Sequence, residues 1–166
     1  MELGESCTSI VVRYLKQQGL NAMAGWPKEE RKRYTKPILV VQVREMQADS
    51  AGFQDYLGER YEESTGLWQE VYGKKLHITF GLDLYVTERG DSQSLREAAQ
   101  QLSQAFVLGA PDGMWVEEIF GGEIRWDESS RCLKLENSLR CGAWLQAVRG
   151  VDSKFLDFEL RGVCNT

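Results

Sequence analysis

The sequence predicts an α+β fold, in which a mostly antiparallel β-sheet carries two main helices in a single domain covering residues 1–166. Two segments, 7–18 and 92–108, repeat apolar residues at helical spacing, whereas 76–86 alternates apolar and polar residues with a period of two. From residue 114 onward, β-rich runs are separated by Gly, Asp and Ser. Runs of strands interrupted by two helices are typical of a sheet with helices packed on one face.

The two predicted helices have recognisable ends. Ser6 is placed to act as the N-cap of the 7–18 helix, and Gly19 falls where a left-handed residue ends a helix. In the second helix, Ser94 and the glutamate three positions later match a capping box. Its predicted buried stripe consists of Leu95, Ala98, Ala99, Leu102, Ala105 and Phe106.

The predicted strands differ in their patterns. The β-branched run at 38–43 is typical of a buried strand. In 76–86, residues such as Phe80 and Leu82 alternate with polar residues such as Thr79, so one face of the strand is expected to be buried. Further strands are predicted at 115–120, 122–126, 131–135, 139–148 and 154–161.

Segment 46–73 is the least regular part of the sequence. It contains four glycines among aromatic residues, and we expect strand pieces with an irregular loop around 59–66. An excursion of this length is uncommon unless it binds something. One subunit could hardly bury so many aromatic side chains at once, and aromatic residues are favoured anchors at interfaces. The resulting interface candidates are Tyr56, Tyr61, Trp68 and Tyr72.

A basic cluster at 28–36 supplies three further interface candidates, Arg31, Lys32 and Arg33. A solvated loop between helix and strand is its plainest interpretation. The neighbouring Trp26 and Tyr34 leave a small nucleic-acid patch open. Docking onto the acidic 111–129 segment of a neighbouring copy is a third possibility, since opposite patches on one chain can generate rings.

Residues suited to catalysis or to metal or cofactor binding do not form a known motif in the sequence. His77 is the single histidine, on the polar side of the 76–86 strand, and the four cysteines lack C-x-x-C spacing. Carboxylates are frequent between 111 and 129, where a solvated face or an interface is the expected role. We therefore assign no catalytic, metal or cofactor-binding residue, expect no cofactor, and expect a chain that is not an enzyme.

Charge and hydropathy narrow the expected partners and location. The formal net charge of −5 argues against a protein that mainly grips nucleic-acid phosphates. The N-terminus lacks the pattern of a secretory signal, and the longest apolar run is far short of the roughly 20 residues that span a membrane. The sequence therefore predicts a cytosolic, soluble chain without a membrane partner.

The ordered set of segments resembles the tail terminator proteins of long-tailed bacteriophages, in the form carried by phages and prophages of Gram-positive bacteria. The matching segments are an N-terminal helix ending in Leu15-Lys16-Gln17-Gln18-Gly19-Leu20, the strand at 37–44, Gly52-Phe53-Gln54-Asp55-Tyr56-Leu57-Gly58, the strand at 75–85, the helix near 92–108, and the closing stretch at 155–162.

The resemblance implies a small α/β subunit of a homo-oligomeric, hexameric ring. Such a ring caps the tail tube, stops its polymerisation and joins it to a head-completion or connector protein. The implied partners are copies of itself, the tail tube protein and the connector, with DNA only as passing cargo. The implied location is the virion, at the head–tail junction, after assembly in the host cytoplasm.

Other functions stay open at this point. A head–tail connector or head-completion adaptor has the same size and character, and a tail-like bacteriocin could use the same subunit. A small cytosolic enzyme or ligand-binding domain would be favoured by a deep pocket that holds His77 with two carboxylates. A nucleic-acid accessory protein would use the 28–36 cluster.

Overall fold

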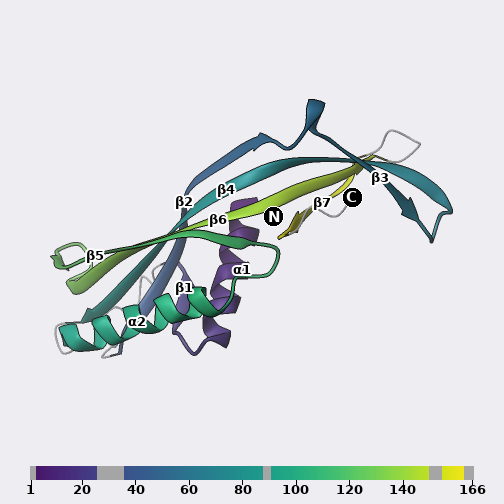
Figure 1. The fold of residues 1–166 in the computed structure, drawn as a ribbon. Coiled ribbons are helices and arrows are strands. Elements are labelled where there is room, and N and C mark those ends of the chain that lie inside the picture. Colours follow the sequence, from purple (N-terminus) through teal and green to yellow (C-terminus); the bar gives the residue numbers. More distant parts are fainter. Residues whose placement is uncertain (1–2, 26–35, 88–90, 150–154, 163–166) are drawn as a thin grey trace.

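The computed structural model describes residues 3–25, 36–87, 91–149 and 155–162, with backbone only for 155–159. Figure 1 shows how its helices and strands are arranged. In chain order they are α1 (Leu3–Gln17), β1 (Ala22–Ala24), β2 (Ile38–Ser50), the 3-10 turn η1 (Phe53–Asp55), β3 (Tyr56–Glu62), β4 (Leu67–Thr87), α2 (Ser92–Leu108), β5 (Trp115–Asp127), β6 (Cys132–Arg149) and β7 (Phe155–Arg161).

The described strands form one mixed sheet of seven strands in the order β1-β2-β4-β6-β5, with β3 on β4 and β7 on β6. This confirms a sheet with two main helices but corrects the expected strand directions. β1 runs parallel to β2, with residues 22–24 beside 39–41, whereas the other pairs are antiparallel. Three residues are too few to show a strand period, so this parallel pair could not be predicted from the residue pattern.

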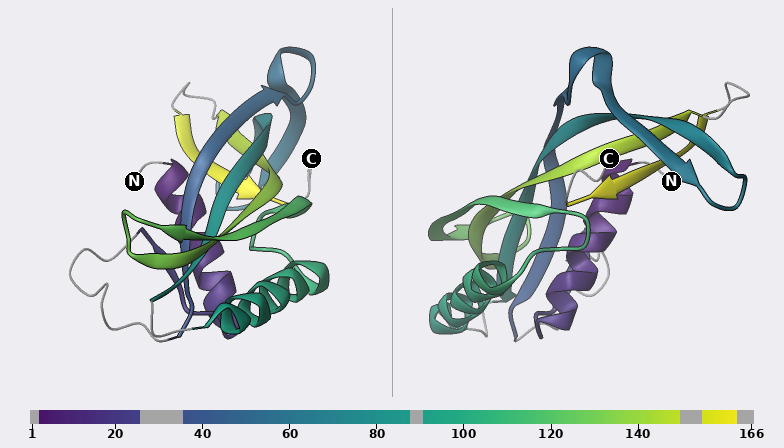
Figure 2. Two further views of the ribbon diagram at one scale, coloured as in Figure 1. Left: turned by 90° about the vertical axis from the view of Figure 1, so that its left-hand side faces the viewer. Right: turned by 45° about the vertical axis from the view of Figure 1, so that its right-hand side comes forward.

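Both helices pack against one half of the sheet (Figures 1 and 2), and the hydrophobic core lies between them and that half. The predicted alternation in β4 is confirmed: all six apolar residues from Leu76 to Val86 are at most 1% exposed. Tyr14 joins the two helices, because its hydroxyl donates a hydrogen bond to the Ala105 carbonyl and its ring lies 5.6 Å from that of Phe106. The helices contribute Cys7, Val11, Leu15, Leu95, Leu102, Ala105 and Phe106 to the buried set.

The helix starts differ from the predictions. α1 begins at Leu3, so Ser6 lies inside the helix and is not its N-cap. In α2 the N-cap is Asp91, whose carboxylate accepts a hydrogen bond from the Ser94 backbone N–H at 2.8 Å. Aspartate caps as well as serine, and Asp91 precedes Ser94 by the three residues that this bond requires. Gly19 does adopt the predicted left-handed conformation after α1, with φ +84°.

β5 and β6 are each longer than the strands predicted in these regions. The expected break near Gly121 is a β-bulge, where the register of β5 on β6 shifts between Gly121 and Ile124. In β6 the expected break near Asn137 is also continuous strand. The Asn137 amide donates to the carbonyls of Leu82 at 3.0 Å and Leu135 at 3.3 Å, so this polar residue is bonded within the strand and does not mark a turn.

Segment 46–73 is more regular than expected. β2 continues to Ser50, and β3 then pairs with β4, leaving a turn of only four residues at 63–66. Two glycines that indicated a loop lie within the hairpin instead: Gly58 lies at a bulge with φ +139°, and Gly66 is in the turn with φ +66°. Residues 56–72, called the arm below, extend beyond the helices at one end of the sheet (Figures 1 and 2).

Candidate functional site

The four predicted aromatic interface residues share one face of the arm. Tyr61 lies opposite Trp68 with ring centroids 5.4 Å apart, and Tyr56 lies opposite Tyr72 at 5.6 Å. Directly opposite residues in an antiparallel pair share a face, as do residues four apart on one regular strand such as Trp68 and Tyr72. Trp68 remains 63% exposed, Tyr61 50% and Tyr56 43%. The arm therefore presents two aromatic pairs on one face, with the Glu59–Glu70 pair between them, and we call this surface the aromatic face.

The turn at the end of the arm is held in one shape. Glu62 accepts three of the hydrogen bonds in this turn. The Gly66 N–H donates to the Glu62 carbonyl at 2.8 Å, and the Thr65 hydroxyl donates to the same carbonyl at 3.4 Å. The Ser64 hydroxyl donates to the Glu62 carboxylate at 2.9 Å. Because these bonds form within the hairpin, the aromatic face is largely prearranged for a partner, which lowers the entropy cost of binding.

The base of the arm is anchored to β4. The Lys74 ammonium lies 2.6 Å from the Asp55 carboxylate, and this hydrogen bond is the main reason that the pKa of Asp55 is lowered. Gln54 and Asp55 both adopt left-handed backbone conformations, with φ of +53° and +62°, where the chain passes from β2 into β3. Such conformations are uncommon for residues with a side chain, so this corner is held by its surroundings.

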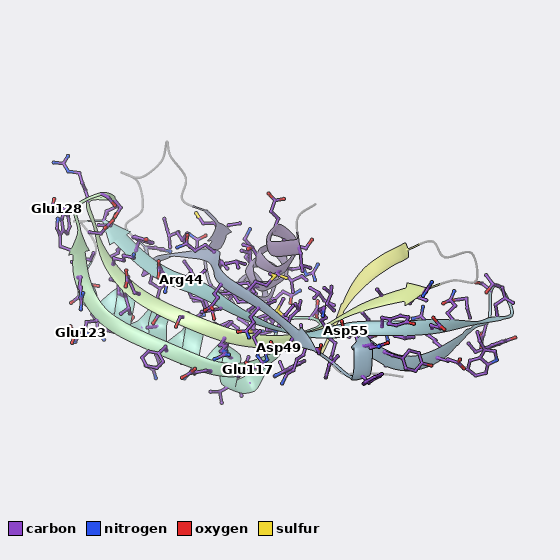
Figure 3. The ribbon with its side chains drawn as sticks, turned by 90° about the horizontal axis from the view of Figure 1, so that it is seen from above. Arg44, Asp49, Asp55, Glu117, Glu123 and Glu128 are labelled. Carbon is purple, nitrogen blue, oxygen red and sulfur yellow. The ribbon has the colours of Figure 1, made fainter. Side chains whose placement is uncertain are left out.

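A second candidate lies on the polar face of the sheet, around His77. Its Nδ1 is 2.9 Å from Glu117 Oε2, and its Nε2 is 3.6 Å from Asp49 Oδ2. Figure 3 shows Asp49 and Glu117 close together near the middle of the sheet. Glu117 also contacts Arg140, whose Nε is 3.3 Å away, and accepts a hydrogen bond from the Trp115 indole at 3.2 Å. These residues come from β2, β4, β5 and β6, so the cluster ties four strands together.

The Glu117 carboxylate is stabilised in its charged form. Partial burial raises its pKa, but hydrogen bonds from His77 and Trp115 and the charges of His77 and Arg140 outweigh that effect, so the net pKa is lowered. A carboxylate with a lowered pKa is a poor proton donor near neutral pH. The observed geometry therefore favours a structural tie across the strands over acid–base chemistry.

A second ionic cluster, six residues further along β4, surrounds Asp83, which is 1% exposed. Arg44 binds one oxygen of its carboxylate at 2.7 Å, and the Lys134 ammonium is 3.5 Å from the other oxygen. Lys134 also contacts Glu136 at 2.7 Å. Burial lowers the pKa of Lys134, but the bond to Glu136 and the charge of Asp83 raise it further than burial lowers it. The buried carboxylate is thus compensated by two cations.

The described cysteines are placed as core residues. Cys7, Cys132 and Cys141 are buried. Burial raises the pKa of the Cys7 thiol to about 11 and is the main reason that the pKa of Cys141 rises to about 12. Thiols of this kind are weak nucleophiles and weak metal ligands at neutral pH. Among the residues that the structure describes, no group of three or more His, Cys, Asp or Glu is arranged to hold a metal ion.

The aromatic residues of the arm were recognised in the sequence as interface candidates, but the side-chain contacts that join the strands around His77 were not predicted. Nothing local connects Asp49 or Glu117 to His77, because their proximity depends on the register of β2 and β5 in the sheet. The basic candidates Arg31, Lys32 and Arg33 lie outside the described residues. In the part of the chain that is described, no helix has the length and apolar character needed to cross a bilayer.

Comparison with known proteins adds no family to these observations. No protein-family model matches the chain, and no curated protein matches its sequence.

Proposed function

We propose that this chain is a structural subunit that assembles into a ring through its arm, and that the ring acts as a bacteriophage tail terminator. The observation that carries the proposal is the aromatic face: three large aromatic side chains between 43% and 63% exposed on a projecting hairpin. Exposed large aromatic side chains gathered on one face of a projecting hairpin mark an interaction site, and aromatic residues dominate the energetics of such sites.

The arrangement of the rest of the described molecule supports a structural role. The helices and the core occupy one half of the sheet, so the arm can contact a partner without disturbing the hydrophobic core. The polar face is occupied by ion pairs that satisfy one another across strands. In this proposal the subunit's partners are other copies, the tail tube protein and the head connector, and it needs no catalytic apparatus.

A ligand-binding domain is the second candidate, and one observation favours it. His77 lies between two carboxylates, which is part of the arrangement that such a function would require. However, the Glu117 carboxylate already has three partners within the protein, which leaves it less able to bind a small molecule. A connector adaptor would use the same arm and differ in the protein that it joins.

Assembly with a tail tube protein tests the proposal. The purified chain, imaged by negative-stain electron microscopy, is expected to form rings, and adding it to polymerising tube protein from the same genome is expected to shorten the tubes. Trp68→Ala is expected to abolish both effects. Trp126→Ala is the matched control, because Trp126 is 41% exposed but lies on β5, outside the arm. Rings that bind a connector and leave tube length unchanged would favour the adaptor, and a monomer that leaves tube length unchanged would contradict the proposal.

A further inference from the structure

An open pocket of about 560 Å³ lies between α1 and β1, on a different part of the molecule from the arm. Its volume falls within the range of roughly 300–1,000 Å³ that is usual for binding sites. Two cationic side chains, Arg13 and Lys16, stand at this pocket. Arg13 forms an ion pair with Asp112 at 3.0 Å, but both partners are more than half exposed, so the pair is weak. The described lining is Ser9, Val12, Arg13, Lys16, Gln17 and Ala24.

The end of the arm has the complementary chemistry. Trp68 and Tyr61 are 63% and 50% exposed and lie opposite each other, whereas Leu67, 50% exposed, is opposite Glu62 on the other face of the hairpin. The exposed carboxylates of Glu59 and Glu63 lie on the same hairpin, so apolar anchors are flanked by negative charge. The pocket combines apolar lining from Val12 and Ala24 with positive charge.

We propose that the end of the arm of one copy binds in the α1 pocket of a second copy. This inference rests on the proposed function and names the surface that receives the arm. Within one copy the arm extends away from α1 (Figure 1), so the contact joins two copies. The arm and the pocket are different surfaces, so the contact is head-to-tail, and head-to-tail contacts close into rings when the rotation between subunits allows it.

Salt should weaken this contact. The two charged sets are exposed, and the attraction between exposed charges decays over a screening length of about 8 Å at physiological ionic strength, which shortens as salt is added. The aromatic contribution is insensitive to screening. Assembly is therefore expected to weaken with added salt and to be lost when the aromatic anchors are removed.

A charge exchange between the two surfaces tests the inference, with solution mass measured by analytical ultracentrifugation. Arg13→Glu/Lys16→Glu and, separately, Glu59→Lys/Glu63→Lys should each raise the dissociation constant about tenfold or more, because attraction becomes repulsion. Glu62 is left intact because it holds the turn. A chain carrying all four substitutions has complementary charges again and is expected to recover most of the wild-type affinity.

The outcomes separate this inference from the proposed function. The inference is overturned if the four substitutions together give no recovery while Trp68→Ala still prevents assembly, a result that leaves the proposed function standing. Glu123 and Glu128 lie toward the other end of the sheet from the arm (Figure 3). The inference is also overturned if Glu123→Lys/Glu128→Lys, and not the arm substitutions, restores the assembly of Arg13→Glu/Lys16→Glu. A wild-type chain that stays monomeric overturns both. Circular dichroism of each variant checks that it is folded.

Discussion

Tyr61 and Trp68 face each other across the β3–β4 hairpin, with ring centroids 5.4 Å apart and at least half of each side chain exposed. Contact between the two rings fixes their orientation, yet about half or more of each side chain stays in water. A cross-strand aromatic pair of this kind contributes about 0.2–1 kcal/mol to the hairpin. Its larger capacity is for binding, because a partner that covers both rings removes their remaining apolar surface from water.

The core beneath the helices is expected to respond strongly to truncation. Phe80 and Leu102 are 0% and 1% exposed, so Phe80→Ala and Leu102→Ala should each lower the free energy of unfolding by about 2–5 kcal/mol. Thr79→Ala is the control, because Thr79 lies on the opposite face of the same strand. Urea denaturation measures all three. A larger loss for Thr79→Ala than for the other two would contradict the assigned strand face.

Removing Arg44, the cation closest to the buried Asp83 carboxylate, should lower the stability of the fold more than removing an exposed cation. The Asp83 carboxylate has two cations near it, and Arg44→Met removes the closer one and leaves only Lys134. Removing one partner of a buried ion pair costs roughly 3–5 kcal/mol, and we expect a smaller loss here because Lys134 remains. Arg125→Met is the control, since its pair with Glu123 is largely exposed and worth about 1 kcal/mol at most. Equal thermal stability of the two variants would contradict this account of the Asp83 cluster.

Protonation of Glu117 should destabilise the sheet in acid. Because the pKa of Glu117 is lower in the folded chain than in the unfolded one, its stabilising effect is fully present above the unfolded value, about 4.3. The effect is lost as the pH falls through the lower folded value. Glu117→Gln should therefore reduce stability at pH 7 and flatten its dependence on pH below about 5. An unchanged acid profile, measured by denaturation from pH 7 to pH 3, would show that the carboxylate contributes no such linkage.

His77→Ala is expected to leave assembly intact. Glu117 keeps Arg140 and Trp115 as partners in this variant, so the strands stay joined and the arm is untouched. The expected result is wild-type solution mass with a modestly lower melting temperature. Loss of function in a folded, assembled His77→Ala protein would instead support the ligand-binding alternative.

Repeating patterns of apolar residues predicted the elements whose burial is decided along a single helix or strand. The two helices and the buried face of β4 follow from spacing that repeats along the chain, because burial selects one face of a helix or strand. The ends of elements were less predictable, since Asp91 and Ser94 are both good capping residues and only the structure shows which one accepts the bond.

The arm and the side-chain contacts between strands could not be predicted in the same way. Gly58 and Gly66 indicated a loop, whereas pairing of β3 with β4 uses them at a bulge and a turn. The aromatic residues were identified as interface candidates by composition, but their common face depends on the β3–β4 register. Likewise, His77, Asp49 and Glu117 are brought together by pairings between distant segments, which no local pattern encodes.

Assembly through the aromatic face of the arm is tested by comparing the solution mass of the wild-type chain with that of Trp68→Ala. Multi-angle light scattering after size exclusion, at one matched concentration, is the measurement. We expect a closed oligomer for the wild type, with a hexamer as the expected state, and a folded monomer for Trp68→Ala. A monomeric wild type, or a Trp68→Ala protein of wild-type mass, would contradict the claim that the arm's aromatic face joins one subunit to the next.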